Sequence, residues 1–223
     1  MNIISCDLKD SWIQAAVEVV VKALLEDVEA FGEASLALSG GSTPYPVYQA
    51  LASDTRLDWS KIVLVQVDER YVPVEDPEYN WIKITEALGG DVIMRSSNVC
   101  AFDTSLSREA SVQQMEECLP NQLTVAILGM GTDGHIASLF PNQPWNVDGQ
   151  KVLATDAPAE YPTRERLSLS DTYLRQAHKQ IVLITGAEKQ AVLQSVCDTG
   201  VWDTQYPVSL LLDGKSVEVV SWS

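Results

Sequence analysis

The sequence predicts an α/β protein built on an open, mainly parallel, twisted sheet with helices on both faces. Short apolar runs of strand length alternate with segments whose apolar residues recur at helical spacing. Such runs are typical of strands that are covered on both sides, as in parallel sheets. No repeat, low-complexity tract or linker interrupts the 223 residues, so we expect a single domain over 1–223.

The first predicted elements alternate between helix and strand. Residues 11–31 carry apolar side chains at helical spacing and end near Gly32, which predicts a helix. The apolar run 34–38 predicts a strand, 44–51 a helix and 62–67 a second strand. The later elements expected, in chain order, are helices at 78–88 and 107–119, strands at 123–128, 167–170 and 181–186, a helix at 187–197 and a strand at 217–222.

The composition limits the class of partner. A hydrophobic fraction of 46% and a charged fraction of 21% are ordinary for a globular protein, and no apolar run approaches a membrane span. The first residues lack the features of a signal peptide, so we expect a cytoplasmic protein with no membrane partner. The net charge of −16 argues against nucleic acid. An anionic substrate would therefore need a local positive field.

The cysteines and histidines predict no metal site. Cys6, Cys100, Cys118 and Cys197 lie far apart in the chain and form no Cys-x-x-Cys pair. The two histidines are also distant from each other, so nothing has the spacing of metal ligands. We expect reduced, mostly buried thiols.

Four polar or glycine-bearing segments follow predicted strands, at 39–43, 68–73, 129–135 and 185–189. In a parallel sheet, ligands bind beyond the carboxyl ends of the strands. Because these segments should converge on that one edge, the sequence predicts a binding site there.

Two of the segments are candidates for binding phosphate. In SGGSTP, free N–H groups at the start of a helix and the hydroxyls of Ser42 and Thr43 favour the binding of an anion. We expect either Ser42 or Thr43 to cap that helix and Pro44 to lie in its first turn. An ordinary tight turn is the alternative, and neither a Walker lysine nor GxGxxG spacing is present. Lys189 falls in the first turn of another helix, where it is either a solvated lysine or a partner of bound phosphate.

The segment GMGTDGHIASLFP, residues 129–141, carries the candidate base. His135 follows a glycine-rich turn, and imidazole moves protons near neutral pH, although a capping or core histidine is the alternative. Asp133 could orient the ring or accept a hydrogen bond from a sugar hydroxyl. Ser138 lacks a GxSxG elbow, so a serine nucleophile is not expected. His178 is expected at the surface.

In DERYVP, the charged residues follow a strand that should be buried. Arg70 could donate two hydrogen bonds to a phosphate or a carboxylate. Asp68 could hold substrate hydroxyls or orient a base. A structural ion pair between the two is the alternative.

These segments together resemble the 6-phosphogluconolactonase family, within a wider group that includes glucosamine-6-phosphate deaminases. The match runs in order from SGGSTP through DERYVP and GMGTDGHIASLFP to PTRERLSLS and TGAEK. The deaminases tend toward DEY and DGHIAFNEP, in which an acidic residue follows the histidine. This chain has Leu139 and Phe140 instead, which favours the lactonases.

The resemblance implies a Rossmann-like three-layer sandwich with a few extra peripheral strands. It implies hydrolysis of 6-phospho-D-glucono-1,5-lactone to 6-phospho-D-gluconate in the oxidative pentose phosphate pathway, without a metal or organic cofactor. His135 would deprotonate water without a covalent intermediate, and we expect a monomer or weak homo-oligomer. The catalytic residues implied are His135, Asp68 and Arg70; those at the substrate or its phosphate are Gly40, Gly41, Ser42, Thr43, Arg70, Asp133, Arg166 and Lys189.

The chain departs from the family pattern at two points, and two other functions stay open. Tyr79-Asn80 replaces the usual Ser-Asn pair after DER. Two arginines, Arg164 and Arg166, could fill the one arginine position that the family pattern expects near the substrate; we prefer Arg166 because it directly precedes LSLS. The alternatives are an amino-sugar phosphate deaminase or isomerase and a sugar-phosphate sensor without turnover.

Overall fold

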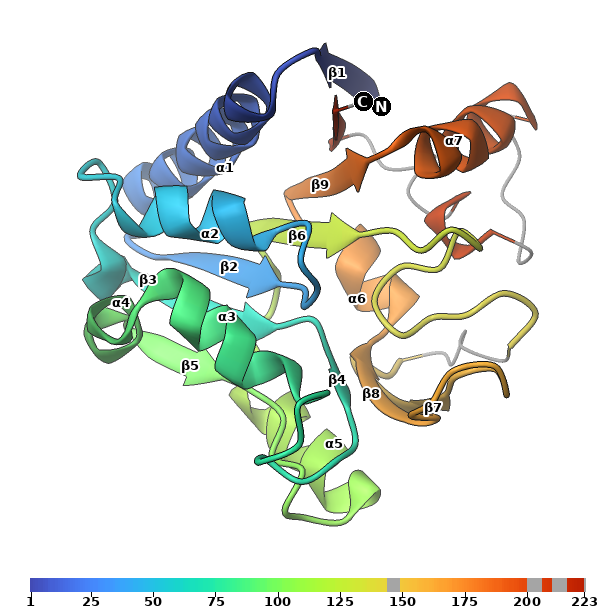
Figure 1. Cartoon of the computed structure of the whole chain (residues 1–223). Coiled ribbons are helices and arrows are strands. Elements are labelled where there is room, and N and C mark those ends of the chain that lie inside the picture. Colours follow the sequence, from blue (N-terminus) through green and yellow to red (C-terminus); the bar gives the residue numbers. More distant parts are fainter. Residues whose placement is uncertain (144–148, 200–205, 210–215, 223) are drawn as a thin grey trace.

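The protein is built on two sheets of different kinds (Figure 1). The computed structural model describes residues 1–143, 149–199, 206–209 and 216–222. All neighbouring strands of the larger, seven-stranded sheet are parallel, and those of the three-stranded sheet are antiparallel. In spatial order the larger sheet contains β1 (Asn2–Cys6), β10 (Val217–Trp222), β9 (Lys179–Thr185), β6 (Val125–Gly129), β2 (Ala34–Leu38), β3 (Ile62–Gln66) and β5 (Asn98–Cys100). The smaller sheet contains β4 (Asp68–Arg70), β8 (Glu165–Leu169) and β7 (Val152–Asp156).

Helices cover both faces of the large sheet. One face packs against α1 (Lys9–Phe31), α2 (Tyr45–Ala52), α3 (Asn80–Leu88) and α4 (Gly90–Arg95), with a short 3-10 helix at Trp59–Lys61. The other face packs against α5 (Arg108–Cys118), α6 (Asp171–Arg175), α7 (Ala187–Thr199) and the small sheet. The predicted three-layer fold with extra peripheral strands is confirmed.

The central strands are apolar throughout because each contributes to two cores. On β2, Leu36 and Leu38 are buried beneath α1 and α2, whereas Ala37 between them faces the opposite core. On β3, Leu64 and Val65 divide in the same way. Successive side chains of a strand point to opposite faces, so both must be apolar when both are covered.

Each helix and strand expected from the sequence is present, with ends that agree to within two residues. The elements that were not predicted are β1, β4, α4, β5, β7, α6 and the 3-10 helix. Two of them, β4 and β5, have three residues each, which is too short for a periodic pattern. β1 is an edge strand with mostly exposed side chains, so it lacks the apolar run of a central strand. Within the described ranges, no helix is long and apolar enough to cross a membrane.

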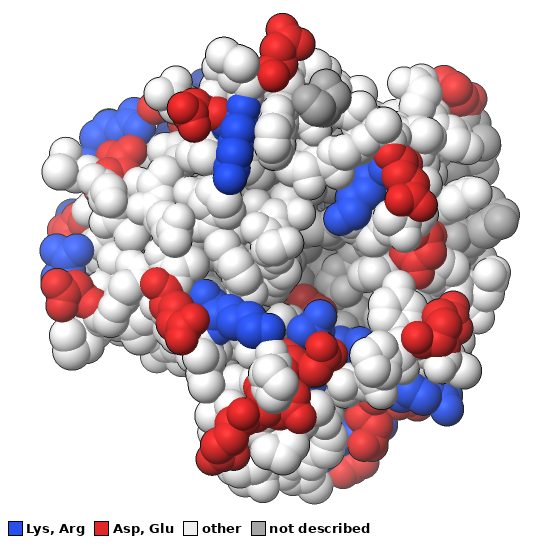
Figure 2. Space-filling view, in the orientation of Figure 1, with Lys and Arg blue, Asp and Glu red and all other residues white. Residues whose placement is uncertain are grey.

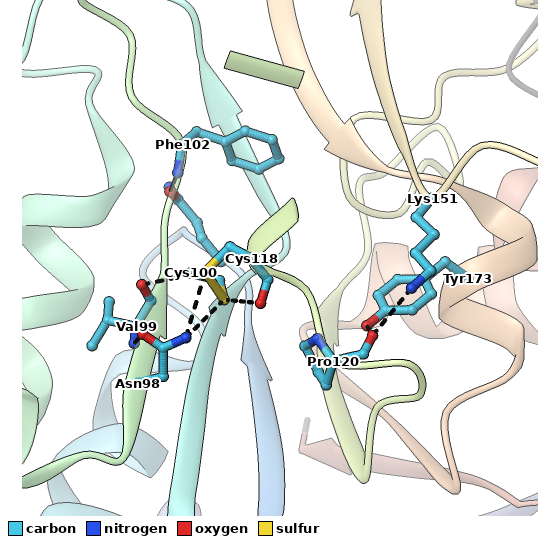
Figure 3. The surroundings of a disulfide bond; sticks show 9 residues. Asn98, Val99, Cys100, Phe102, Cys118, Pro120, Lys151 and Tyr173 are labelled. Atoms are coloured by element: carbon cyan, nitrogen blue, oxygen red, sulfur yellow. Dashed lines mark hydrogen bonds between the residues drawn. A yellow bond between two sulfur atoms is a disulfide. The ribbon is translucent and has the colours of Figure 1, made fainter. Parts of the chain in front are cut away.

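The expectation that the cysteines are reduced thiols is wrong for one pair. Cys100, at the end of β5, forms a disulfide with Cys118, the last residue of α5 (Figure 3). Their Cα atoms are 5.6 Å apart, a normal separation for a disulfide. The two cysteines are 18 residues apart in sequence, and only the return of α5 along the sheet brings them together. Cys6 and Cys197 are free and partly buried.

We expect the disulfide to stabilise the fold by about 3 kcal/mol, because it removes the loop entropy of the unfolded chain. Urea unfolding with and without reductant measures this. The variant Cys118→Ala should show the stability of the reduced wild type whether or not reductant is present, whereas Cys6→Ala should lose stability on reduction as the wild type does. Four reactive thiols in the denatured, unreduced protein, rather than the two free cysteines, would contradict the bond.

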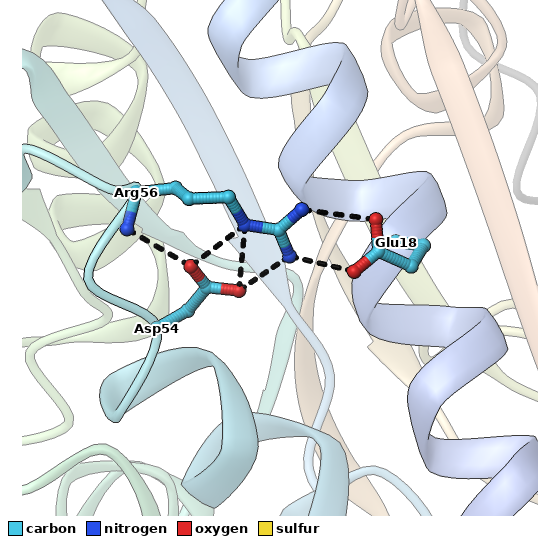
Figure 4. Close-up of polar contacts among 3 residues, drawn as sticks. All are labelled: Glu18, Asp54 and Arg56. Atoms are coloured by element: carbon cyan, nitrogen blue, oxygen red, sulfur yellow. Dashed lines mark hydrogen bonds and ion pairs between the residues drawn. The ribbon is translucent and has the colours of Figure 1, made fainter.

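An arginine ties the loop after α2 to the first helix. Arg56 lies 2.6 Å from the carboxylate of Asp54 and 2.7 Å from that of Glu18 on α1 (Figure 4). Its hydrogen bonds lower the pKa of both carboxyl groups. Because the cluster is largely exposed to solvent, it orients the loop more than it stabilises the protein.

Candidate active site

A cavity of about 290 Å³ opens at the carboxyl ends of β9, β6, β2 and β3, which are neighbours in the sheet. The four polar segments expected there each follow one of these strands. Figure 2 shows basic side chains on two sides of a hollow on this face. The cavity walls include Gly40, Gly41, Ser42, Thr43, Asp68, Arg70, His135, Arg166 and Lys189, and Asp133 contacts His135.

The loop after β2 forms one wall through its backbone. Gly41 has φ 99°, a left-handed conformation that favours glycine. A Cβ on Gly40 would lie 2.2 Å from the side chain of Asn80, so that position also requires glycine. The expected cap by Ser42 or Thr43 is wrong: Pro44 occupies the cap position of α2, which receives no side-chain hydrogen bond. The two hydroxyl-bearing residues line the cavity instead.

Another part of the wall contains two arginines that face each other. Arg70 on β4 and Arg166 on β8 are direct partners in the antiparallel register. Arg166 is 4% exposed, and no described residue accepts a hydrogen bond from its Nε. Burial and the charge of Arg70 lower the pKa of Arg166. Like charges directly opposite each other destabilise a sheet, and the charges of Asp68, Glu78 and Glu69 offset part of this repulsion. An anion bound beside the pair would offset it further.

The structure also separates the two candidate arginines. Arg166 lines the cavity, whereas Arg164 lies outside the wall and its Nε contacts the carbonyl of Ala157 at 3.4 Å. Lys189, in the first turn of α7, lines the cavity with Arg166. Burial lowers the pKa of Lys189, and a bound anion would offset that cost.

A buried glutamate holds the arginine wall in place. The carboxylate of Glu69 accepts hydrogen bonds from the backbone N–H groups of Arg70, Asn80 and Trp81 and from the amide of Gln66, at 2.6–2.9 Å. Burial raises the pKa of Glu69 to about 7, although these hydrogen bonds oppose the shift. Glu69 thereby joins the start of α3 to β4. Asn80, fixed in this way, accepts a hydrogen bond from Arg70 Nη1 at 3.0 Å.

His135 is oriented by Asp133. The imidazole Nδ1 lies 2.6 Å from Asp133 Oδ1. Burial raises the pKa of Asp133, but the hydrogen bond and charge of His135 lower it more, to about 2. The carboxylate is therefore ionised and can only accept, so Nδ1 must carry the hydrogen. In the neutral ring, Nε2 then holds a lone pair that can take a proton from water.

The loop that carries His135 leaves no room for larger side chains. A Cβ on Gly131 would lie 2.2 Å from His135 Nδ1, and Gly134 has φ 80°. The glycines of this loop thus allow the ring to pack against the backbone. Such packing holds the imidazole in one orientation.

Ser138 is not paired with the histidine. Its hydroxyl donates to Asp68 Oδ2 at 2.8 Å, and its side chain is buried. Asp68 is in turn placed beside the arginine pair by β4. This arrangement gives Ser138 a role in fixing Asp68.

Sequence reasoning missed three residues of the cavity wall: Asn80, Phe140 as a ring partner of His135, and Tyr161. Tyr161 lies in the weakly patterned 142–165 segment, of which 144–148 lie outside the described residues. Asn80 belongs to the Tyr79-Asn80 pair, and the sequence pattern does not predict its hydrogen bond with Arg70. His178 is exposed, as expected, and pairs with Asp27.

The cavity brings together side chains that can bind an anion and a histidine that can act as a base. The arginines, Lys189 and the loop after β2 can hold an anion, and His135 can activate water. Across the described ranges, no cluster of three or more His, Cys, Asp or Glu side chains could hold a metal ion. The site is therefore suited to hydrolysis of an anionic substrate by activated water.

Comparison with known proteins identifies the relatives of this chain. The family model for glucosamine-6-phosphate isomerases and 6-phosphogluconolactonases matches residues 7–222. The chain belongs to this family.

Several relatives are lactonases. The 6-phosphogluconolactonase of Thermotoga maritima is 35% identical over 185 residues, covering 82% of this chain and 83% of the relative. That of Caulobacter vibrioides is 32% identical, covering 96% and 94%. The crystal structure of a 6-phosphogluconolactonase from Shewanella baltica has a TM-score of 0.90 at 27% identity, covering 100% and 97%. A monomeric glucosamine-6-phosphate deaminase, at 17% identity and a TM-score of 0.78, shares the fold.

Proposed function

We propose that this family member hydrolyses 6-phospho-D-glucono-1,5-lactone to 6-phospho-D-gluconate, as part of the oxidative pentose phosphate pathway. Relatives named for this activity cover most of the chain. The observation that carries the proposal is the buried Arg166 directly opposite Arg70, in a cavity that also contains His135. A phosphate group would neutralise the pair, and the lactone carbon would then extend toward the base.

The proposed reaction needs only water and His135. As the oxygen of water bonds to C1 of the lactone, Nε2 accepts its proton and the carbonyl electrons move to oxygen. An arginine or loop N–H groups stabilise the oxyanion, which is worth roughly 3–4 kcal/mol for preorganised donors. The bond from C1 to the ring oxygen then breaks, and the imidazolium returns the proton to that oxygen. Binding of the phosphate supplies the energy that orients C1.

The residues around the histidine favour this reaction over deamination. In the deaminase-like pattern an acidic residue follows the histidine, whereas here Phe140 packs its ring 4.9 Å from that of His135. Leu139 and Phe140 are both buried. An apolar ring at this position offers no carboxylate for proton transfer to an amino sugar.

The proposal predicts that the purified protein releases acid from freshly generated 6-phosphogluconolactone. The rate should exceed spontaneous hydrolysis in proportion to enzyme concentration, and a pH-stat measures it. The unphosphorylated gluconolactone is the control, for which we expect kcat/KM lower by roughly 100-fold or more because the binding energy of the phosphate is lost. Ammonia release from glucosamine 6-phosphate, with no acid from the lactone, would decide for the deaminase.

We further propose that the protein acts in the cytoplasm as a monomer or weak homo-oligomer. Cytoplasmic reductants keep most thiols reduced, so the location requires that the Cys100–Cys118 bond be protected. Cys100 is 1% exposed, which supports such protection.

A further inference from the structure

Tyr161 lies against the proposed base from a different part of the chain. It occupies the loop between β7 and β8 and lines the same cavity as His135. Its hydroxyl is 3.2 Å from Asp133 Oδ2 and 3.4 Å from His135 Nδ1. The tyrosine thus contacts both members of the His–Asp pair.

The hydrogens of this group can be assigned from its chemistry. Burial raises the pKa of Tyr161 to about 12, so the phenol keeps its hydrogen at neutral pH. Since the Asp133 carboxylate can only accept, Tyr161 donates to Oδ2 while the His135 Nδ1–H donates to Oδ1. With its two oxygens held by different donors, the carboxylate is prevented from rotating.

Two aromatic rings that contact each other pack against the imidazole. The Tyr161 ring meets that of His135 edge-on, with centroids 5.9 Å apart and an interplanar angle of 83°. Phe140 lies 4.9 Å from His135 and 5.1 Å from Tyr161. Close packing against these two rings restricts rotation of the imidazole.

The loop itself is anchored at several points. The N–H of Ala157 donates to the carbonyl of Arg164 at 2.7 Å, and that of Tyr161 to the carbonyl of Pro158 at 3.1 Å. The hydroxyl of Thr163 contacts Glu78, before α3, at 3.4 Å. These contacts place the tyrosine over the histidine.

We infer that Tyr161 is a positioning residue for the proposed lactonase reaction: by holding Asp133 and packing against the imidazole, it keeps His135 as the Nδ1–H tautomer with Nε2 free. This inference rests on the proposed function. It assigns no direct contact between Tyr161 and the reacting atoms.

Removing only the hydroxyl tests this role. We expect Tyr161→Phe to lower kcat for 6-phosphogluconolactone by about tenfold, the effect of one lost hydrogen bond to a charged group. KM should stay within about twofold, because the arginine wall is untouched. The matched control is Tyr173→Phe, which removes a hydroxyl bonded to the Pro120 carbonyl at 2.6 Å (Figure 3) and should leave kcat unchanged. An unchanged kcat in Tyr161→Phe would overturn the proposal.

A second readout needs no substrate. The chain has two histidines, so imidazole ¹H–¹⁵N spectra of the labelled protein are simple to assign. His178 faces Asp27 through Nδ1 at 2.7 Å and serves as an internal reference. In wild type we expect the Nδ1–H tautomer of His135, and in Tyr161→Phe a clearly detectable Nε2–H tautomer, with the signals of His178 unchanged.

The two readouts separate the inference from the proposed function. If the wild type fails to hydrolyse the lactone, the proposed function fails, yet the tautomer spectra still test the role of Tyr161. If the wild type hydrolyses it and the spectra of Tyr161→Phe match those of wild type, the role of Tyr161 is wrong and the lactonase activity stands.

Discussion

Replacing His135 with asparagine is expected to lower kcat for 6-phosphogluconolactone by roughly 100-fold or more, the typical contribution of a general base. Asparagine can keep a hydrogen bond to Asp133 but cannot take a proton from water. KM should change little, because His135 is not among the residues proposed to contact the phosphate. Initial rates over a range of lactone concentrations separate the two constants.

The control for this variant is the same substitution at the other histidine. His178 also contacts an aspartate through Nδ1, but it lies just before β9, at the opposite edge of the sheet. His178→Asn should therefore retain wild-type turnover. Near wild-type turnover in His135→Asn, with both variants folded by circular dichroism, would exclude His135 as the base.

The position of the site could be predicted because local patterns mark where each strand ends. Each polar segment directly follows an apolar run, and parallel strands bring such segments to one edge. The sequence could not show that the four strands are adjacent. β6 is distant from β2 in the sequence but pairs with it in the sheet. This pairing places His135 beside the loop that contains Ser42.

The contacts that could not be predicted depend on long-range packing. Tyr161 reaches His135 only because β7 and β8 form an antiparallel pair beside the main sheet. Cys100 and Cys118 meet only after α5 returns along the sheet. Glu69 looks like one more surface charge in DERYVP, yet the start of α3 closes over it. In each case the residue type was visible and its partner was not.

Replacing Arg166 with methionine is expected to raise KM for 6-phosphogluconolactone by about 30- to 100-fold, the loss for a charge-assisted contact in a buried site. The same variant should not lose stability in the absence of substrate. Methionine fills a similar volume and removes one of two like charges that face each other across β4 and β8, so the free energy of unfolding should stay equal or rise by up to about 1 kcal/mol.

The matched control is Arg164→Met, which makes the same change two residues away. Arg164 lies outside the cavity, so KM should stay within about twofold of wild type. Urea unfolding with and without inorganic phosphate adds a measurement that is independent of turnover. Phosphate should stabilise the wild type and Arg164→Met but stabilise Arg166→Met much less, because a ligand stabilises only the form that binds it. Equal KM changes in the two variants, or equal stabilisation by phosphate, would remove Arg166 from the anion site.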